Sequence, residues 1–126
     1  MRVDRIVKAA VAALEDIKGR DIVVLNVVKL SSLFDRVIIA SGDSTRQVKS
    51  LADNVVVELK GAGAKVNGVE GAQNAEWILI DLGSVVVHVM LPAIRAHYNL
   101  EELWSALPAR KASRRRVAVE ADAQSE

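Results

Sequence analysis

The segment 77–90 contains three side chains that could take part in catalysis or binding, namely a carboxylate, an imidazole and an indole. Two apolar runs flank the dipeptide Gly83-Ser84, a pattern that favours a tight β-hairpin. With this loop, the strand residues pair as Leu82/Val85, Asp81/Val86, Ile80/Val87, Leu79/His88, Ile78/Val89 and Trp77/Met90. Because side chains alternate between the faces of a strand, the carboxylate, imidazole and indole are predicted to share one face.

The two faces of this hairpin differ in what they could do. One is wholly apolar and consists of Ile78, Ile80, Leu82, Val85, Val87 and Val89. The other consists of Trp77, Leu79, Asp81, Val86, His88 and Met90. Asp81 and His88 lie diagonally across the strands and could form a carboxylate–imidazole pair. A hydrogen bond that orients the imidazole is the simpler interpretation, and catalysis, which would also need an activated nucleophile, is not assigned.

Aromatic residues make up only 3% of the chain, so the position of each is informative. Trp77 shares its predicted face with Asp81. It could belong to the core or to a binding surface, and both interpretations have equal weight, because Trp, Tyr and Arg dominate the binding energy of protein interfaces. Trp104, in the sequence LEELW, is predicted to pack a terminal helix onto the sheet.

A second polar segment, SGDSTRQ at 41–47, is predicted at a strand-to-helix turn. The free N–H groups of a helix start can hold an anion, and Arg46 would add a charge. Capping by Ser44, with Gln47 as its capping-box partner, explains the segment more simply. A nucleotidyltransferase would need paired carboxylates on a following strand to hold two metal ions, and the sequence has no such pair.

Hydrophobic periodicity predicts the elements that position these residues. They are a helix capped by Asp4 that ends near Gly19, strands at 21–28 and 36–40, a helix from Ser44 to about Lys60, a connection at 68–71, the hairpin, and one or two short helices within 94–103. This order predicts an α/β fold. We expect a single domain, residues 1–104, with a mixed four- to five-stranded sheet and flanking helices.

Composition excludes several classes of protein. The chain has 126 residues, of which 51% are hydrophobic, enough for one domain with a real core. It contains no Cys and two His, so no disulfide, metal or cofactor site is predicted. The N-terminus is typical of an amphipathic helix, and no apolar run is long enough to span a membrane. We expect a cytoplasmic protein without a membrane partner.

The charge is unevenly distributed along the chain. The net charge is +1, but the last 22 residues alone carry five basic and three acidic side chains, so the preceding residues are close to neutral. A nearly neutral body does not resemble a dedicated nucleic-acid binder. The tail, residues 105–126, is expected to be disordered. Its basic run at 110–116 could contact ribosomal RNA or could simply keep the protein soluble.

Several separate motifs resemble one family, the Iojap proteins or ribosomal silencing factors. The resemblance extends over roughly residues 4–104. Its matching stretches are Asp35, 37–48, Glu70-Gly71, 77–81, 86–89, Arg95, 98–101 and Leu103-Trp104. It implies a fold that is similar to that of nucleotidyltransferases without their metal-binding acids.

The resemblance also implies a function. A family member would bind the large ribosomal subunit through large-subunit ribosomal protein fourteen, at the face where the small subunit joins. It would block joining sterically and repress translation when nutrients are short. Such a protein is not an enzyme.

Three other roles remain open at this point. They are assembly of the large subunit, a nucleotide-binding enzyme that uses the 41–47 turn, and a general RNA-binding protein that uses 110–116. The oligomeric state also remains open, and a homodimer of the free protein through a sheet edge or apolar face is compatible with the sequence.

We expect the partner-binding surface to combine an apolar anchor with acidic acceptors for a basic ribosomal surface. The anchor is Trp77, and the acceptors are Glu70 and Asp81. The remaining predicted members are His88, Arg95 and Tyr98.

Overall fold

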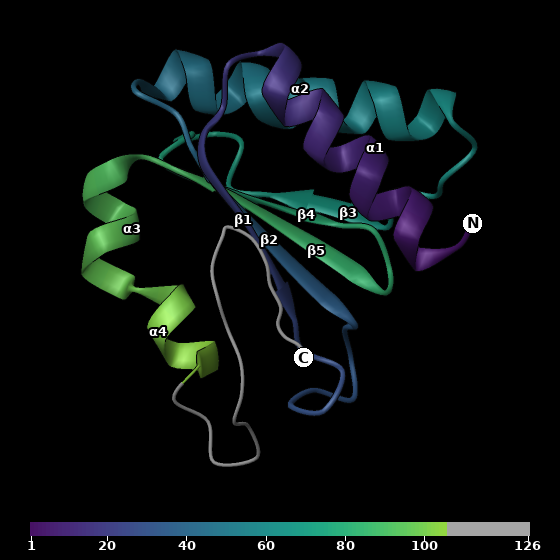
Figure 1. The fold of residues 1–126 in the computed structure, drawn as a ribbon. Helices are drawn as coiled ribbons and strands as arrows, with labels where there is room; N and C mark the ends of the chain where they lie inside the picture. Colours follow the sequence, from purple (N-terminus) through teal and green to yellow (C-terminus); the bar gives the residue numbers. More distant parts are fainter. Residues whose placement is uncertain (106–126) are drawn as a thin grey trace.

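The protein is a five-stranded mixed sheet with helices packed on it (Figure 1). The computed structural model describes residues 1–105. The elements are α1 (Val3–Asp16), β1 (Arg20–Asn26), β2 (Arg36–Ser41), α2 (Thr45–Gly61), β3 (Gly68–Glu70), β4 (Trp77–Asp81), β5 (Val85–Met90), α3 (Pro92–Tyr98) and α4 (Leu100–Ser105). The strand order is β1-β2-β5-β4-β3. β2 and β5 run parallel and the other neighbours antiparallel, which confirms the predicted mixed sheet.

The main core lies between the sheet and the helices α1 and α2, which cover the same face of it (Figure 1). Apolar residues at helical spacing form the buried side of each helix. They are Ile6, Ala10, Ala13 and Leu14 in α1, and Val48, Leu51, Ala52, Val55 and Leu59 in α2. The apolar face of the β4–β5 hairpin is buried against them, as its pattern predicts.

The predicted hairpin register is confirmed. Trp77 pairs with Met90, Leu79 with His88, and the loop at Gly83-Ser84 closes through a 2.9 Å hydrogen bond from the Leu82 N–H to the Val85 carbonyl. All six residues of β5 are buried, because this strand lies in the middle of the sheet. The side chain of His88 is therefore fixed by the most central strand.

A second, smaller core covers part of the opposite face. Its buried members are Val27, Val37, Ile39, Val86 and Met90. Leu30 and Phe34, from the connection between β1 and β2, pack against it, and so do Ile94 of α3 and Leu100 of α4. The face of the hairpin that carries Trp77, Asp81 and His88 is thus partly covered by the two C-terminal helices. These helices lie apart from α1 and α2 (Figure 1).

Some local predictions need correction. Asp4 does not cap α1: the N-cap is Arg2, which makes no side-chain capping bond, and Asp4 lies in the first turn, where a carboxylate favours the helix dipole. The connection at 68–71, by contrast, contains a short edge strand, β3, which is the fifth strand of the predicted four- to five-stranded sheet. The predicted tail begins at Ser105, the last residue of α4, and the remainder of it lies outside the described residues, as does the side chain of Trp104.

Candidate functional site

Trp77 and His88 form the centre of the polar face of the hairpin. The indole Nε1–H of Trp77 donates a 2.9 Å hydrogen bond to Nδ1 of His88, and the two rings are 5.8 Å apart. Since Nδ1 accepts this bond, the imidazole proton of the neutral ring must be on Nε2. His88 is only 8% exposed, whereas Trp77 is half-buried.

Tyr98 of α3 lies on the other side of Trp77. The ring centroids of the two residues are 4.9 Å apart and their planes are tilted by 49°. Tyr98 is 53% exposed. Trp77 and Tyr98 therefore form an aromatic pair that is partly buried in the protein and partly exposed to solvent.

Burial sets the protonation of His88. Loss of solvation lowers the pKa of His88 from its ordinary value of 6.5 to about 4, because a buried site disfavours the charged imidazolium. The ring is thus neutral at physiological pH. It can then accept the hydrogen bond from Trp77 at any pH well above 4.

This lowered pKa predicts a pH-dependent stability. The unfolded chain takes up the His88 proton near pH 6.5 and the folded chain only near pH 4, so this contribution is complete above pH 6.5 and is lost as the pH falls to 4. We expect the free energy of unfolding to drop by about 3 kcal/mol across this window. Urea denaturation at pH 7 and pH 4.5 measures the drop, and His88→Asn should remove most of it. Equal losses in the parent and the variant would contradict the assignment.

Asp81 is not the partner of His88. Within the described part of the chain its carboxylate Oδ1 accepts a 2.9 Å hydrogen bond from the N–H of Gly83. Gly83 has a φ of 91°, so the carboxylate stabilises a left-handed turn. The predicted carboxylate–imidazole pair is therefore wrong, and Asp81 remains half-exposed at the far end of the same face.

Glu70 lies on the same side of the sheet. It pairs with Leu79 in the β3–β4 ladder, and residues that face each other across a ladder point to one side. It is exposed on an edge strand. The structure thus brings the predicted acids Glu70 and Asp81 to the face that carries Trp77 and His88.

Arg95 holds α3 and α4 against the end of the sheet. Its guanidinium donates two hydrogen bonds, of 3.1 and 2.8 Å, to the carboxylate of Glu101 in α4, and a third, of 2.9 Å, to the hydroxyl of Ser41 at the end of β2. The Arg95 side chain is only 11% exposed. Its hydrogen-bonding groups are therefore largely committed within the protein, and its place beside a partner stays a prediction.

Removal of this clamp should destabilise the C-terminal helices. Arg95→Met keeps much of the aliphatic stem but leaves the buried Ser41 hydroxyl and Glu101 without their partner, which costs about 2–3 kcal/mol. Urea denaturation and amide hydrogen exchange in α3 measure the effect. The matched control is Arg20→Met, because Arg20 bonds Asp43 in an exposed ion pair that is worth less than about 1 kcal/mol. Equal losses from both variants would contradict the clamp.

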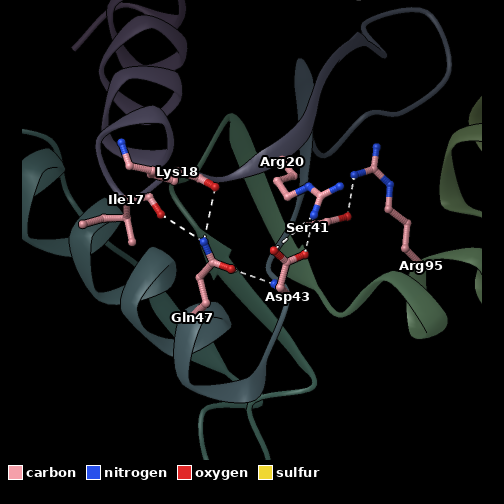
Figure 2. Close-up of polar contacts among 7 residues, drawn as sticks. All are labelled: Ile17, Lys18, Arg20, Ser41, Asp43, Gln47 and Arg95. Atoms are coloured by element: carbon pink, nitrogen blue, oxygen red, sulfur yellow. Dashed lines mark hydrogen bonds and ion pairs between the residues drawn. The ribbon is translucent and has the colours of Figure 1, made fainter.

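The polar segment 41–47 is occupied by internal contacts (Figure 2). The hydroxyl of Ser44 accepts from the N–H of Gln47, which confirms the predicted cap. The Gln47 side chain accepts from the N–H of Asp43 and donates to the carbonyls of Ile17 and Lys18 at the end of α1. This junction joins α1 to α2, so structural capping accounts for its residues better than an anion site does.

Among residues 1–105, no three His, Asp or Glu side chains come together as a metal ion would require. In the same part of the chain, no helix is long and apolar enough to cross a membrane. The half-exposed aromatic pair, with acids on the same face, is suited to recognition of another macromolecule.

Comparisons with known proteins agree with this picture. A family model described as "Ribosomal silencing factor during starvation" matches residues 1–126. The ribosomal silencing factor RsfS of Chromobacterium violaceum is 57% identical over 104 residues, which cover 82% of this chain and 85% of that protein. The chain therefore belongs to the family of ribosomal silencing factors, which supports the role of a ribosome-associated repressor.

A solved structure and an organellar relative extend the comparison. The crystal structure of a protein from Chromobacterium violaceum matches with a TM-score of 0.82 at 54% identity, covering 90% of this chain and 92% of that one. A mouse protein named "Mitochondrial assembly of ribosomal large subunit protein 1" is 34% identical over 98 residues, which cover 75% of this chain and 43% of that protein.

Proposed function

We propose that this protein binds the large ribosomal subunit in the cytoplasm and prevents the small subunit from joining it. The contact is to large-subunit ribosomal protein fourteen at the subunit-joining face. Repression is then steric, since the bound factor occupies space that the small subunit needs. The observation that carries this proposal is the half-exposed pair of Trp77 and Tyr98.

The aromatic pair supports a binding role because its exposure needs an explanation. Aromatic anchors near the centre of an interface supply a large share of binding energy, particularly where they are already ordered before binding. Trp77 is ordered by contacts on two sides, with His88 and with Tyr98. A partner that covers the outer edges of both rings would gain contact area at a low cost in side-chain entropy.

The acids on the same face suit a basic partner. Glu70 is exposed, and Asp81 is half-exposed at the turn of the hairpin. Proteins of the ribosome surface are expected to be basic, and complementary charge increases both the rate and the specificity of association. These two carboxylates would guide the aromatic pair into place.

Co-sedimentation with separated ribosomal subunits tests the binding step. We expect the protein to sediment with large subunits and to remain in the supernatant with small ones. A full-length variant with Arg114, Arg115 and Arg116 replaced by Ser serves as a control for binding to RNA through the basic run. Binding to both subunits, lost in that variant and at moderate salt, would contradict the proposal and favour general RNA binding.

Assembly of the large subunit is a second candidate, favoured by the name of the mouse relative. An assembly factor would be needed while subunits mature, whereas a repressor acts on finished ones. Deletion of the gene would separate the two roles. Accumulation of immature large subunits in growing cells would favour assembly, and normal subunits with excess translation in starved cells would favour repression.

A further inference from the structure

The hydrogen bond between Trp77 and His88 joins a half-buried residue to the fully buried strand β5. An indole has a single hydrogen-bond donor, and that of Trp77 points inward to Nδ1 of His88 at 2.9 Å. His88 lies in β5, where every residue is buried. The position of the acceptor is therefore set by the centre of the sheet.

Trp77 depends on neighbouring side chains for its orientation. It is the first residue of β4, directly after the loop at 71–76, and its side chain is half-buried. A tryptophan at such a position can adopt several rotamers unless its neighbours select one. His88 bonds the donor of the indole, and Tyr98 lies against its ring at 4.9 Å. Together these contacts select one orientation.

His88 is poorly placed to contact a partner. It is 8% exposed, and it is covered on its own face by Trp77 and by the small core that includes Val86 and Met90. Direct contact would require this core to open. An indirect effect needs no such movement.

We propose that His88 is a positioning residue of the ribosome-binding surface, which acts by fixing the indole of Trp77 in the orientation that places it beside Tyr98. This inference rests on the proposed function, because it assumes that Trp77 contacts the partner. It assigns His88 an indirect part in binding: the protein presents an anchor whose rotamer is already chosen, and the partner need not order it.

Two substitutions separate the hydrogen bond from the bulk of the side chain. His88→Asn places an acceptor oxygen close to the position of Nδ1, whereas His88→Leu retains bulk and removes the acceptor. Val87→Ala, in the same strand but on the face covered by α1 and α2, controls for lost stability. Trp77→Phe, which lacks the N–H, identifies the indole signal of Trp77 and provides a background in which His88 has no donor to bind.

The free protein provides the first readout. In nuclear magnetic resonance spectra the indole N–H of Trp77 should exchange slowly with solvent and show a scalar coupling to Nδ1 of His88. We expect His88→Leu to accelerate this exchange at least tenfold, and His88→Asn to change it much less. Absence of the coupling in the parent protein would overturn the proposal even if His88→Leu fails to fold.

Binding to purified large subunits provides the second readout. His88→Leu should weaken binding roughly fivefold to tenfold, while His88→Asn and Val87→Ala stay within about twofold of the parent. In the Trp77→Phe background, His88→Leu should have little further effect. Equal weakening by His88→Asn and His88→Leu would overturn the positioning role, and so would parent-like binding by His88→Leu.

The two proposals can fail separately. If Trp77→Ala weakens binding but His88→Leu does not, the surface is correct and the positioning role is wrong. If Trp77→Ala binds as tightly as the parent, the proposed surface is wrong, and the role of His88 in binding fails with it. The exchange rate of the indole still reports on the hydrogen bond in that case.

Discussion

Replacement of Trp77 by alanine is expected to weaken binding to large ribosomal subunits by roughly thirtyfold, which corresponds to about 2 kcal/mol. The change removes the indole from the aromatic pair and leaves Tyr98 with its edge-on contact to His97. Trp77 packs at the margin of the second core and not in the main core under α1 and α2, so the chain should remain folded. Titration with fluorescently labelled protein measures the affinity, and circular dichroism checks the fold.

The matched control for this prediction is another large apolar side chain at the surface. Val57 is 62% exposed on α2, the helix that covers the opposite side of the sheet. We expect Val57→Ala to bind as the parent does. A folded Trp77→Ala protein whose affinity falls less than threefold would remove Trp77 from the interface and require another contact surface.

Replacement of Gly71 by alanine is expected to destabilise the protein by about 3 kcal/mol or more. Gly71 has a φ of 88°, and a Cβ at this position would overlap the carbonyl oxygen of Trp77. The collision involves backbone, so it can be relieved only by moving the loop that leads into β4. Because that loop positions Trp77, binding to large subunits should weaken as well. Urea denaturation measures the stability.

The loss of stability in Gly71→Ala has two causes, the overlap with the Trp77 carbonyl and the left-handed backbone. A substitution at Gly63 separates them. Gly63 has a similar φ of 93°, but a Cβ there would meet no atom within 4 Å. Gly63→Ala should therefore cost only the strain of a left-handed residue, about 1 kcal/mol. If the two variants lose the same stability, the close approach to Trp77 has no energetic weight and only the backbone conformation matters.

Most of the fold could be predicted from local patterns. The register of the hairpin followed from a two-residue loop and strict alternation, because a shift of one residue would turn the apolar face to solvent. The start of α2 followed from Ser44 and Gln47. The cap of α1 could not be predicted in this way. Arg2, the true N-cap, has no capping side chain, whereas Asp4 is of a residue type that commonly caps helices.

The candidate site was predictable only in part. The register places His88 opposite Leu79, so Trp77 and Asp81 are both diagonal neighbours of the imidazole. The sequence pattern alone does not choose between them. In the structure Asp81 accepts a local hydrogen bond from the Gly83 N–H, and Trp77 is the residue that bonds the imidazole. Side-chain contacts between elements far apart in the sequence, such as that of Arg95 with Ser41, were not predicted.

Arg95 illustrates those missed contacts. Its partners Ser41 and Glu101 come from the end of β2 and from α4, and no spacing in the sequence relates these positions. From the sequence, Arg95 is predicted only as a member of the partner-binding surface. Its burial depends on how α3 and α4 fold back over the end of the sheet, which is a property of the tertiary structure.

Light scattering, which measures the joining of the two subunits, tests whether the bound protein blocks joining sterically. Purified large subunits are preincubated with a molar excess of the protein and mixed with small subunits, with Trp77→Ala as the comparison. We predict that the parent protein reduces the formation of joined ribosomes at least tenfold and that Trp77→Ala restores most of it. Normal joining on large subunits that demonstrably carry the parent protein would contradict steric blockade.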